Sequence, residues 1–345
     1  MLSEVRRWSA ARLRGAVART LLATGAEARG RRRQGARLRI LMYHGVVARR
    51  TGPGRCGNLF VDQEAFARHA RSLARDFCVV SLEQVAESVQ AGRPFPDRAV
   101  WITFDDGYRN VVTTALPVLQ ALRLPATVFV LPGLMDAGEG LWFDALRVLL
   151  VDGVEASEDV GHGLTLGRPS ADPERAWTEA VRRILRLDPR LQREMAAQIL
   201  ALGRREQWLP RHPEFALAGW DEWRRACSDG LISVGSHGMR HETLAGLSRE
   251  ACMEEWQRSK SRIEDALGRT CLAAAYPYGA LDASAAEAAR QAGYACAVTT
   301  DEGLNEAQHD PMRLRRTMIG DGGDVALFRA RASGAWDLAR PRGSR

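Results

Sequence analysis

Two adjacent carboxylates, Asp105 and Asp106, follow an apolar stretch in the run Thr103-Phe104-Asp105-Asp106-Gly107. Because side chains alternate along a strand, neighbouring carboxylates point in different directions and cannot do the same work. One of them could bind a metal ion while the other takes protons from a water molecule. An Asp-Asp-Gly turn that caps a helix gives the same letters, so the doublet alone leaves both interpretations open.

Two histidines, His237 and His241, lie four residues apart in the run Ser236-His237-Gly238-Met239-Arg240-His241. If this segment turns like a helix, the two imidazoles converge and supply two nitrogen ligands to one divalent ion. Such pairs also arise by chance in a chain with seven histidines. Together with Asp106, however, they form a His₂-carboxylate set with open positions for water and substrate, as catalytic metal sites require.

Two further candidates are His44 and Tyr278. Tyr278 lies in the run Ala275-Tyr276-Pro277-Tyr278-Gly279, where Pro and Gly favour a tight turn, and a backbone N–H presented there could hold a developing oxyanion. A turn with packed aromatic rings explains the same letters. His44 follows an apolar run and, taken alone, is more often a structural histidine.

The elements that must position these residues alternate between short apolar runs and helical stretches, which is typical of βα units around a parallel sheet. All four candidate segments follow an expected strand, at the end where parallel α/β proteins collect catalytic groups. The expected strands are Leu38–Tyr43, Cys78–Val80, Val100–Phe104, Ala126–Leu131, Leu231–Gly235, Leu272–Tyr276, Ala295–Thr299 and Leu314–Ile319. The expected helices are Gln63–Asp76, Leu82–Gln90, Tyr108–Leu122, Trp220–Ser228, Leu247–Leu267, Ala283–Ala292 and Val325–Trp336.

Residues 135–219 interrupt this alternation. They carry helical periodicity without strand signals and are expected to form a helical insertion with helices over Trp142–Val151, Ala176–Leu187 and Leu191–Leu202. The sequence therefore predicts a basic amphipathic arm over 1–37, a main domain over 38–320 that contains the insertion, and a C-terminal helix and tail over 321–345.

The charge of the chain is concentrated at its start. The net charge is +7, but residues 1–39 contain eleven arginines and only Glu4 and Glu27 as acids. The rest of the chain is close to neutral and does not resemble a nucleic-acid binder, whose positive charge covers a folded face. A composition of 46% hydrophobic and 26% charged residues excludes disorder, collagen and coiled coil as overall descriptions.

The arm is predicted to be a basic amphipathic helix, because six residues fall on one side of a 3.6-residue wheel. They are Leu2, Val5, Leu13, Ala16, Val17 and Thr20. This helix either lies on an anionic membrane surface or docks on its own domain, followed by a mobile linker over Arg29–Gln34. No apolar run reaches the roughly 18 residues of a spanning helix. We therefore expect a cytoplasmic protein, peripheral at the inner membrane if the arm binds there, with its scattered cysteines as reduced, mostly buried thiols.

These motifs, in this order, resemble those of the polysaccharide deacetylase family, the NodB homology domain of carbohydrate esterase family 4. The resemblance covers about residues 38–319 apart from the insertion, and it implies an α/β fold with a deformed (β/α)7-type barrel. It implies that Asp105 is the catalytic base. It also implies that Asp106, His237 and His241 bind a divalent metal, with Zn²⁺ as the default ion.

The chain departs from the family pattern at two of these motifs. Gly238 replaces the hydroxyl residue of His-Ser/Thr-x-x-His, a change the metal site should survive because that side chain supports the loop and is not a ligand. Ala275 stands where many members have the Arg of Arg-x-Pro-Tyr-Gly. We expect Arg316, in the run Arg313-Leu314-Arg315-Arg316, to supply the missing cation to Asp105, while Tyr278 still offers its backbone N–H to the oxyanion.

The C-terminal Leu-x-His that supplies the acid in many members is also absent. In the branch that resembles poly-N-acetylglucosamine deacetylases, this histidine comes from the first strand, and Tyr43-His44 fits that arrangement. The resemblance thus implies metal-dependent hydrolysis of the N-acetyl group of an amino sugar in a carbohydrate substrate, with His44, as the imidazolium, protonating the leaving amine. Trp142, Trp177 and Trp208 of the insertion are either core residues or surfaces on which sugars stack.

Two other functions remain open at this point. A catalytically silent sugar-binding protein would also show an altered third motif, and acetate release from acetylated glucosamine polymers would distinguish it. A metal hydrolase for another bond, such as a phosphodiester, gains slight support from the basic arm.

Overall fold

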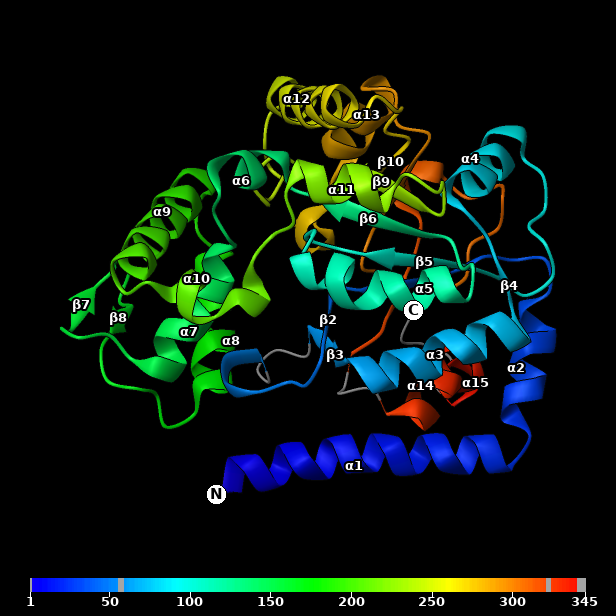
Figure 1. The fold of residues 1–345 in the computed structure, drawn as a ribbon, viewed down its shortest axis with the longest axis horizontal. Coiled ribbons are helices and arrows are strands. Elements are labelled where there is room, and N and C mark those ends of the chain that lie inside the picture. The colour runs from blue at the N-terminus through cyan, green and yellow to red at the C-terminus, as the bar shows by residue number, and fades with distance from the viewer. Residues whose placement is uncertain (1, 55–58, 321–323, 340–345) are drawn as a thin grey trace.

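Parallel strands form the centre of the molecule (Figure 1), a computed structural model that describes residues 2–54, 59–320 and 324–339, with the backbone alone over 2–12. Seven strands are neighbours in the order β11-β10-β9-β6-β5-β1-β12, and β4 pairs with β5 beside this path. The strands of this sheet are β1 Arg39–Tyr43, β4 Cys78–Val79, β5 Ala99–Phe104, β6 Ala126–Val130, β9 Ile232–Ser236, β10 Ala273–Ala275, β11 Cys296–Val298 and β12 Thr317–Met318.

The sheet curls until its two ends meet. Val298 at the end of β11 forms a parallel bridge with Leu314, three residues before β12 begins. All six residues of β5 and all five of β1 are buried, as expected for parallel strands that are covered on both faces. The predicted α/β fold with a deformed barrel of the (β/α)7 type is confirmed.

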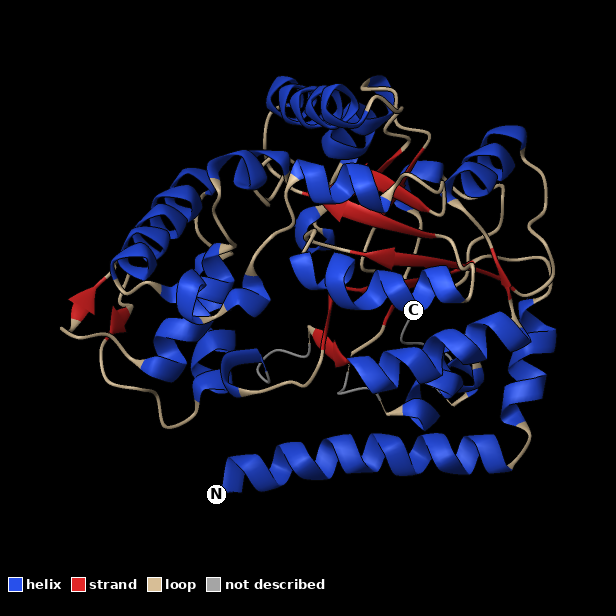
Figure 2. Cartoon of the chain, in the orientation of Figure 1, coloured by secondary structure: helices blue, strands red, loops and turns tan. Residues whose placement is uncertain are grey.

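Helices cover the outside of this sheet (Figure 2). They are α3 Gln63–Asp76, α4 Leu82–Ala91, α5 Leu116–Ala121, α6 Pro132–Ala137, α11 Trp220–Ala226, α12 Arg249–Leu267 and α13 Ala283–Gln291. The helix expected over Tyr108–Leu122 is correct only in part, because the chain first forms a π-helical turn over Val111–Ala115 and then enters α5. Single π-helical turns are rare and often lie beside functional sites.

The insertion forms a separate group of helices on the left of Figure 1. Its helices are α7 Trp142–Asp152, α8 Pro173–Ile184, α9 Pro189–Arg205 and α10 Trp208–Arg211. The expectation that this segment lacks strands is wrong, because β7 Glu158–Asp159 and β8 Thr165–Leu166 form a short antiparallel pair. A second unpredicted pair joins β2 Gly45–Val47 to β3 Phe60–Asp62. Strands of two or three residues are too short to show a periodic pattern.

The N-terminal arm forms two helices, α1 Leu2–Ala23 and α2 Ala26–Gln34. The mobile linker expected over Arg29–Gln34 is therefore wrong, since these residues are helical. Near the C-terminus the chain forms α14 Val325–Ala332 and α15 Ala335–Leu338, and α1 packs along α14 while α2 packs against α15. At Gly30 in α2, an added methyl group would collide with the backbone of residues 333–335. Only glycine permits this close contact between the two ends of the chain.

The apolar stripe predicted for the arm does not face the domain. Ala18 is buried among Leu327, Ala330 and Ala335, and Leu22 packs partly buried against the same cluster, so α1 docks through residues outside the predicted stripe. Leu13 and Val17, which belong to the predicted stripe, are 65% and 37% exposed. The side chains of the other stripe residues Leu2 and Val5 lie outside the described part of the chain.

The cysteines that the structure describes are free thiols. Cys78 is exposed, whereas Cys227, Cys252, Cys271 and Cys296 are buried. Cys56 lies outside the described residues. Over the described chain, no helix combines the length and apolar character that crossing a membrane would require.

Candidate active site

Asp106, His237 and His241 come together in a buried cluster at the end of the barrel where the strands finish. Asp106 Oδ1 lies 3.5 Å from His241 Nε2 and 3.6 Å from His237 Nε2. Among the described residues this oxygen has no hydrogen-bond partner. Two atoms that are each 2.0–2.1 Å from a tetrahedral ion lie roughly 3.3 Å apart. The spacing of these three ligand atoms therefore fits a divalent ion.

Local backbone geometry places two of these ligands. Asp106 has φ 71° and His241 has φ 62°, a left-handed conformation that non-glycine residues seldom adopt. The chain turns sharply at Asp106 and Gly107 as it leaves β5, and a side chain at Gly107 would crowd Val130 of β6. Backbone strain of this kind concentrates at functional sites, where the surrounding structure maintains it.

The tautomer of His237 is set by the neighbouring strand. Its Nδ1–H donates a hydrogen bond of 2.8 Å to the carbonyl oxygen of Ala275, at the end of β10. The lone pair of Nε2 is then free to face Asp106 and an ion, an arrangement common in metal sites. Ala275, which replaces the family arginine, thus serves the site through its backbone.

The glycine in the histidine motif is supported by its own neighbour. Gly238 N donates to the Oγ of Ser236 at 3.2 Å, and Ser236 shares a hydrogen bond of 2.5 Å with Ser259 of α12. Met239 N donates to Glu255 of the same helix at 2.6 Å. Side chains outside the motif therefore hold the loop that carries both histidines.

Burial shifts the pKa values of these three candidate ligands so that each side chain favours its neutral form. It lowers the pKa of His237 and lowers that of His241 well below the usual value, so both imidazoles are neutral. Burial, helped by the charges of Asp105 and Asp144, raises the pKa of Asp106 well above its usual value. Two neutral imidazoles beside a carboxyl group that ionises only with a cation nearby are the donor set that a divalent metal requires.

Asp105 is buried against Arg316. The two guanidinium nitrogens Nη1 and Nη2 donate to Oδ1 and Oδ2 of Asp105 at 2.6 and 2.7 Å, while Nε donates to the carbonyl of Thr299 at 2.8 Å. Burial alone would raise the pKa of Asp105, but the Arg316 charge outweighs it and holds that pKa below its usual value. Asp105 is therefore ionised and fixed in orientation.

His44 follows β1 directly, beside Asp105. The Asp105 amide donates to the carbonyl of Tyr43 at 2.9 Å, so the two strand ends lie next to each other. Burial lowers the pKa of His44 to about 4, with Arg316 and His237 also lowering it and Asp105 opposing them. The imidazole is neutral at pH 7, unlike the imidazolium expected from the sequence.

Tyr278 lies against the same cluster. Its ring centroid is 4.4 Å from that of His241, and its backbone has φ 58° in a short turn after β10. Trp142 of α7 donates from Nε1 to the Tyr278 hydroxyl at 3.1 Å. The insertion therefore contacts the residue whose amide was expected to hold an oxyanion.

Sequence inspection missed a buried pair on α7. Asp144 accepts a hydrogen bond of 2.6 Å from the hydroxyl of Tyr108, and Arg147 Nη1 lies 3.3 Å from Asp144 Oδ1. Both members of the pair are fully buried, and the Tyr108 hydroxyl lies close enough to Asp106 to act against the rise in the pKa of that carboxyl. The available signal was an Asp and an Arg three residues apart within an otherwise apolar helix.

A cavity of about 170 Å³ opens beside His241 and Tyr278. Its other wall comes from α9, with Gln192 and Arg193, and Trp142 also lines it. Arg193 pairs at 3.4 Å with Glu242, the residue after the candidate ligand His241. The insertion therefore borders the approach to the metal cluster.

Comparison with known proteins agrees with this arrangement. The family model described as polysaccharide deacetylase matches residues 92–297, which include the doublet and both histidines. A segment of 47 residues is 47% identical to the poly-β-1,6-N-acetyl-D-glucosamine N-deacetylase of Escherichia coli K12. That segment covers 14% of this chain and only 7% of the relative's length.

Solved structures show the same fold at low sequence identity. The Streptococcus pyogenes deacetylase PplD, in complex with acetate, aligns over 89% of this chain and 100% of its own, with a TM-score of 0.59 and 18% identity. IcaB from Ammonifex degensii aligns over 86% of this chain and 98% of its own, with a TM-score of 0.55 and 18% identity.

Proposed function

Because the chain belongs to the polysaccharide deacetylase family, we propose that it hydrolyses N-acetyl groups on the amino sugars of a poly- or oligosaccharide. The observation that carries this proposal is the convergence of three buried ligand atoms from Asp106, His237 and His241 next to the Asp105–Arg316 pair. The match to a poly-β-1,6-N-acetyl-D-glucosamine N-deacetylase supports a polymer of N-acetylglucosamine as the substrate class.

Asp106, His237 and His241 would hold a divalent metal, and their ligand types make Zn²⁺ the default choice. An ion bound there would lower the pKa of a water molecule and polarise the acetyl carbonyl. Asp105, kept ionised and oriented by Arg316, would accept a proton from the attacking water. The Tyr278 amide would donate to the oxyanion that develops on the acetyl oxygen, an interaction worth roughly 3 to 4 kcal/mol.

His44 would deliver a proton to the sugar nitrogen as the carbon–nitrogen bond breaks. Because its pKa is about 4, the His44 imidazole is neutral before the reaction. During turnover it would take up the proton that Asp105 has accepted from the attacking water and pass this proton to the amine nitrogen. One water is consumed: its oxygen enters acetate, one of its protons reaches the amine nitrogen through Asp105 and His44, and its second proton leaves the acetic acid and is taken up by the amine, so the products are acetate and the protonated amine.

The experiment measures acetate release by the Zn²⁺-loaded full chain from β-1,6- and β-1,4-linked N-acetylglucosamine oligomers. We expect release from at least one of them and none from the His241→Ala variant, which should also lose its zinc by elemental analysis. Zinc bound to the wild-type protein without acetate release from any oligomer would support the silent sugar-binding alternative. A phosphodiester substrate tested in parallel addresses the other alternative.

We also propose that α1 lies on an anionic membrane surface, which would place the protein peripherally at the inner membrane, on its cytoplasmic side. The exposure of Leu13 and Val17 on an arginine-rich helix supports this. The Leu13→Ser/Val17→Ser double variant should bind phosphatidylglycerol vesicles more weakly in a sedimentation assay. Met318→Ser, which changes an exposed residue outside α1, is the matched control. Equal binding of all three proteins would contradict the proposal.

A further inference from the structure

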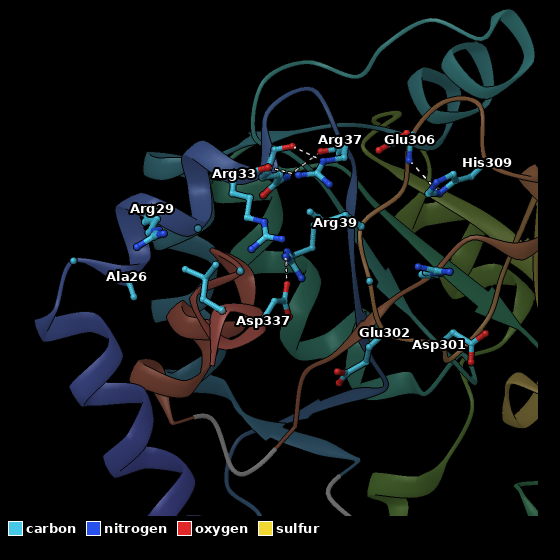
Figure 3. Close-up of a pocket in the computed structure, with 18 of the residues that line it drawn as sticks. Ala26, Arg29, Arg33, Arg37, Arg39, Asp301, Glu302, Glu306, His309 and Asp337 are labelled. Carbon is cyan, nitrogen blue, oxygen red and sulfur yellow. Dashed lines mark hydrogen bonds and ion pairs between the residues drawn. The ribbon is translucent and has the colours of Figure 1, made fainter. Parts of the chain in front are cut away.

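A second, larger cavity of about 1060 Å³ lies away from the metal cluster. Its walls are α2, the segment 301–309 and the end of α15, and its floor includes Arg39, the first residue of β1 (Figure 3). The metal cluster instead lies beyond the last residues of the strands. A strand of five residues is about 16 Å long, so the cavity and the metal cluster lie at opposite ends of the strands, about that distance apart.

One wall carries a row of arginines. Arg29, Arg33 and Arg37 are spaced by four residues, which places them along one side of α2 and its continuation. Like charges at this spacing repel one another. On the same helix, by contrast, Arg31 is paired with Glu27 at 2.7 Å. The three arginines of the row therefore face the cavity, whereas Arg31 faces a carboxylate.

Several of these guanidinium groups have no partner in the part of the chain that the structure describes. Among the residues that the structure describes, the side chains of Arg29, Arg33 and Arg315 form no ion pair or hydrogen bond. Arg37 donates only to backbone carbonyl oxygens, those of Gln34 and Arg33. Arg315 lies on the connection that leads into β12, so the cationic groups come from two separate segments around the cavity.

The floor of the cavity is formed by the buried polar side chains of Arg39 and Gln34. Arg39 is 1% exposed and donates to Asp337 at 2.7 Å and to Thr317 at 3.0 Å. Within the described chain, Arg39 Nε and Oε1 of the neighbouring Gln34 are enclosed by protein and have no hydrogen-bond partner. The floor of the cavity is therefore polar, with a buried guanidinium group that Asp337 holds in place.

The opposite wall is acidic. Asp301, Glu302 and Glu306 line it, and Figure 3 shows Asp301 and Glu302 on the far side of the cavity from Arg29 and Arg33. A simple polyanion would be repelled from this wall. A ligand that suits both walls carries an anionic group at one end and hydroxyl or amino donors at the other.

We propose that this cavity binds a soluble amino-sugar phosphate. The phosphate would lie against Arg29, Arg33 and Arg315, since guanidinium groups bind phosphate oxygens in pairs. The amine and hydroxyl groups would face Asp301 and Glu306. The cavity volume lies at the upper end of the range for small-molecule sites and leaves room for a sugar phosphate with its hydration water. This site is independent of the proposed deacetylase reaction.

The test uses isothermal titration calorimetry of the full chain with three probes at constant ionic strength. Glucosamine 6-phosphate carries both charges, glucose 6-phosphate lacks the amine, and glucosamine lacks the phosphate. We expect glucosamine 6-phosphate to bind most tightly, glucose 6-phosphate about tenfold more weakly, and glucosamine not measurably. The Asp106→Ala variant, altered only at the metal cluster, should bind like the wild type.

The Arg33→Ala/Arg315→Ala variant should lose at least about tenfold in affinity for glucosamine 6-phosphate. Arg32→Ala removes an exposed arginine of the same helix that does not line the cavity and should leave binding unchanged. Thermal melting and acetate release of the double variant show whether it is folded. The proposal is overturned if wild-type protein binds none of the probes, or if the folded double variant binds glucosamine 6-phosphate as the wild type does.

Discussion

At the scale of single residues, the two neighbouring carboxylates differ because of what surrounds them. Asp105 faces a guanidinium at hydrogen-bond distance, whereas the free oxygen of Asp106 faces two neutral imidazoles. The strand direction alone predicted that they would point apart. Which of them would be ionised follows from Arg316, which is distant in sequence.

Replacing Arg316 with Met should lower the activity of the enzyme and change how its free energy of unfolding depends on pH. Asp105 would be left buried without its cation, at a cost of about 3 to 5 kcal/mol at pH 7, and kcat should fall about 100-fold. Because Arg316 holds the folded-state pKa of Asp105 below 3.8, the pair stabilises the fold above that pH and loses this effect as pH falls. The difference in urea-unfolding free energy between wild type and variant should therefore shrink from pH 7 to pH 3. An equal difference at both values would argue against this account.

His44 can be tested through the leaving group of the substrate. His44→Gln should lower kcat for N-acetylglucosamine oligomers by roughly 100-fold or more, because an amine needs a proton to depart. With 4-nitrophenyl acetate, whose leaving group departs as the anion, the loss should be below tenfold. Zinc content should not change. A similar loss on both substrates would show that His44 does not act as the acid.

At the scale of elements, α7 links the insertion to the metal cluster through two hydrogen bonds. Trp142 donates to Tyr278, and Asp144 accepts from Tyr108, whose hydroxyl also lies beside Asp106. The insertion is therefore more than a cover over the site, because it orients residues on either side of the cluster.

We expect Tyr108→Phe to weaken metal binding by about 10- to 100-fold, since groups that orient a ligand contribute this much to affinity. Competition with a zinc chelator measures the effect without any substrate. The control for local packing is Val112→Ala, which shortens a partly buried side chain four residues further along the chain. Equal zinc affinity in all three proteins would mean that Tyr108 supports the fold alone.

Long periodic elements could be predicted from the sequence, and short ones could not. Gln63–Asp76 forms a helix with the predicted bounds because its apolar residues repeat at helical spacing over fourteen residues. The β7–β8 pair is held by only two residues in each strand, and the turn over Val111–Ala115 differs from an α-helix only in its hydrogen bonds. Local sequence carries little information about either.

The candidate site could be predicted where its residues sit in motifs, and not where contact depends on the folded chain. The doublet and the histidine pair were visible from spacing. Asp144 and Tyr108 meet only after the insertion folds back on the barrel, and Ala275 acts through a carbonyl that no residue type reveals.

At the scale of the whole molecule, the buried cysteines should make the folded protein less stable at alkaline pH. Burial raises the pKa of Cys271 and Cys296 to about 12 and of Cys227 and Cys252 to about 11, against 9.0 for a free thiol. The folded state therefore keeps protons that the unfolded chain releases, and the free energy of unfolding should fall as pH rises above about 9.

The same burial protects these thiols from reagents. At pH 8, Ellman's reagent should label Cys78 quickly in the native protein and reach the four buried cysteines only after denaturation. A Cys78→Ser variant separates the fast signal of Cys78 from that of Cys56. Rapid native labelling of four or more thiols would mean that the core opens readily.

The contact between α2 and α15 at Gly30 joins segments that are about 300 residues apart in the chain. At roughly 5 to 20 residues per second, the ribosome takes about 15 to 60 s to make the intervening sequence. Throughout that interval the first two helices have emerged but their docking partners do not yet exist. A newly made chain thus displays an uncovered, arginine-rich helix for many seconds, long enough for a chaperone or a lipid surface to meet it before the final helices arrive to compete.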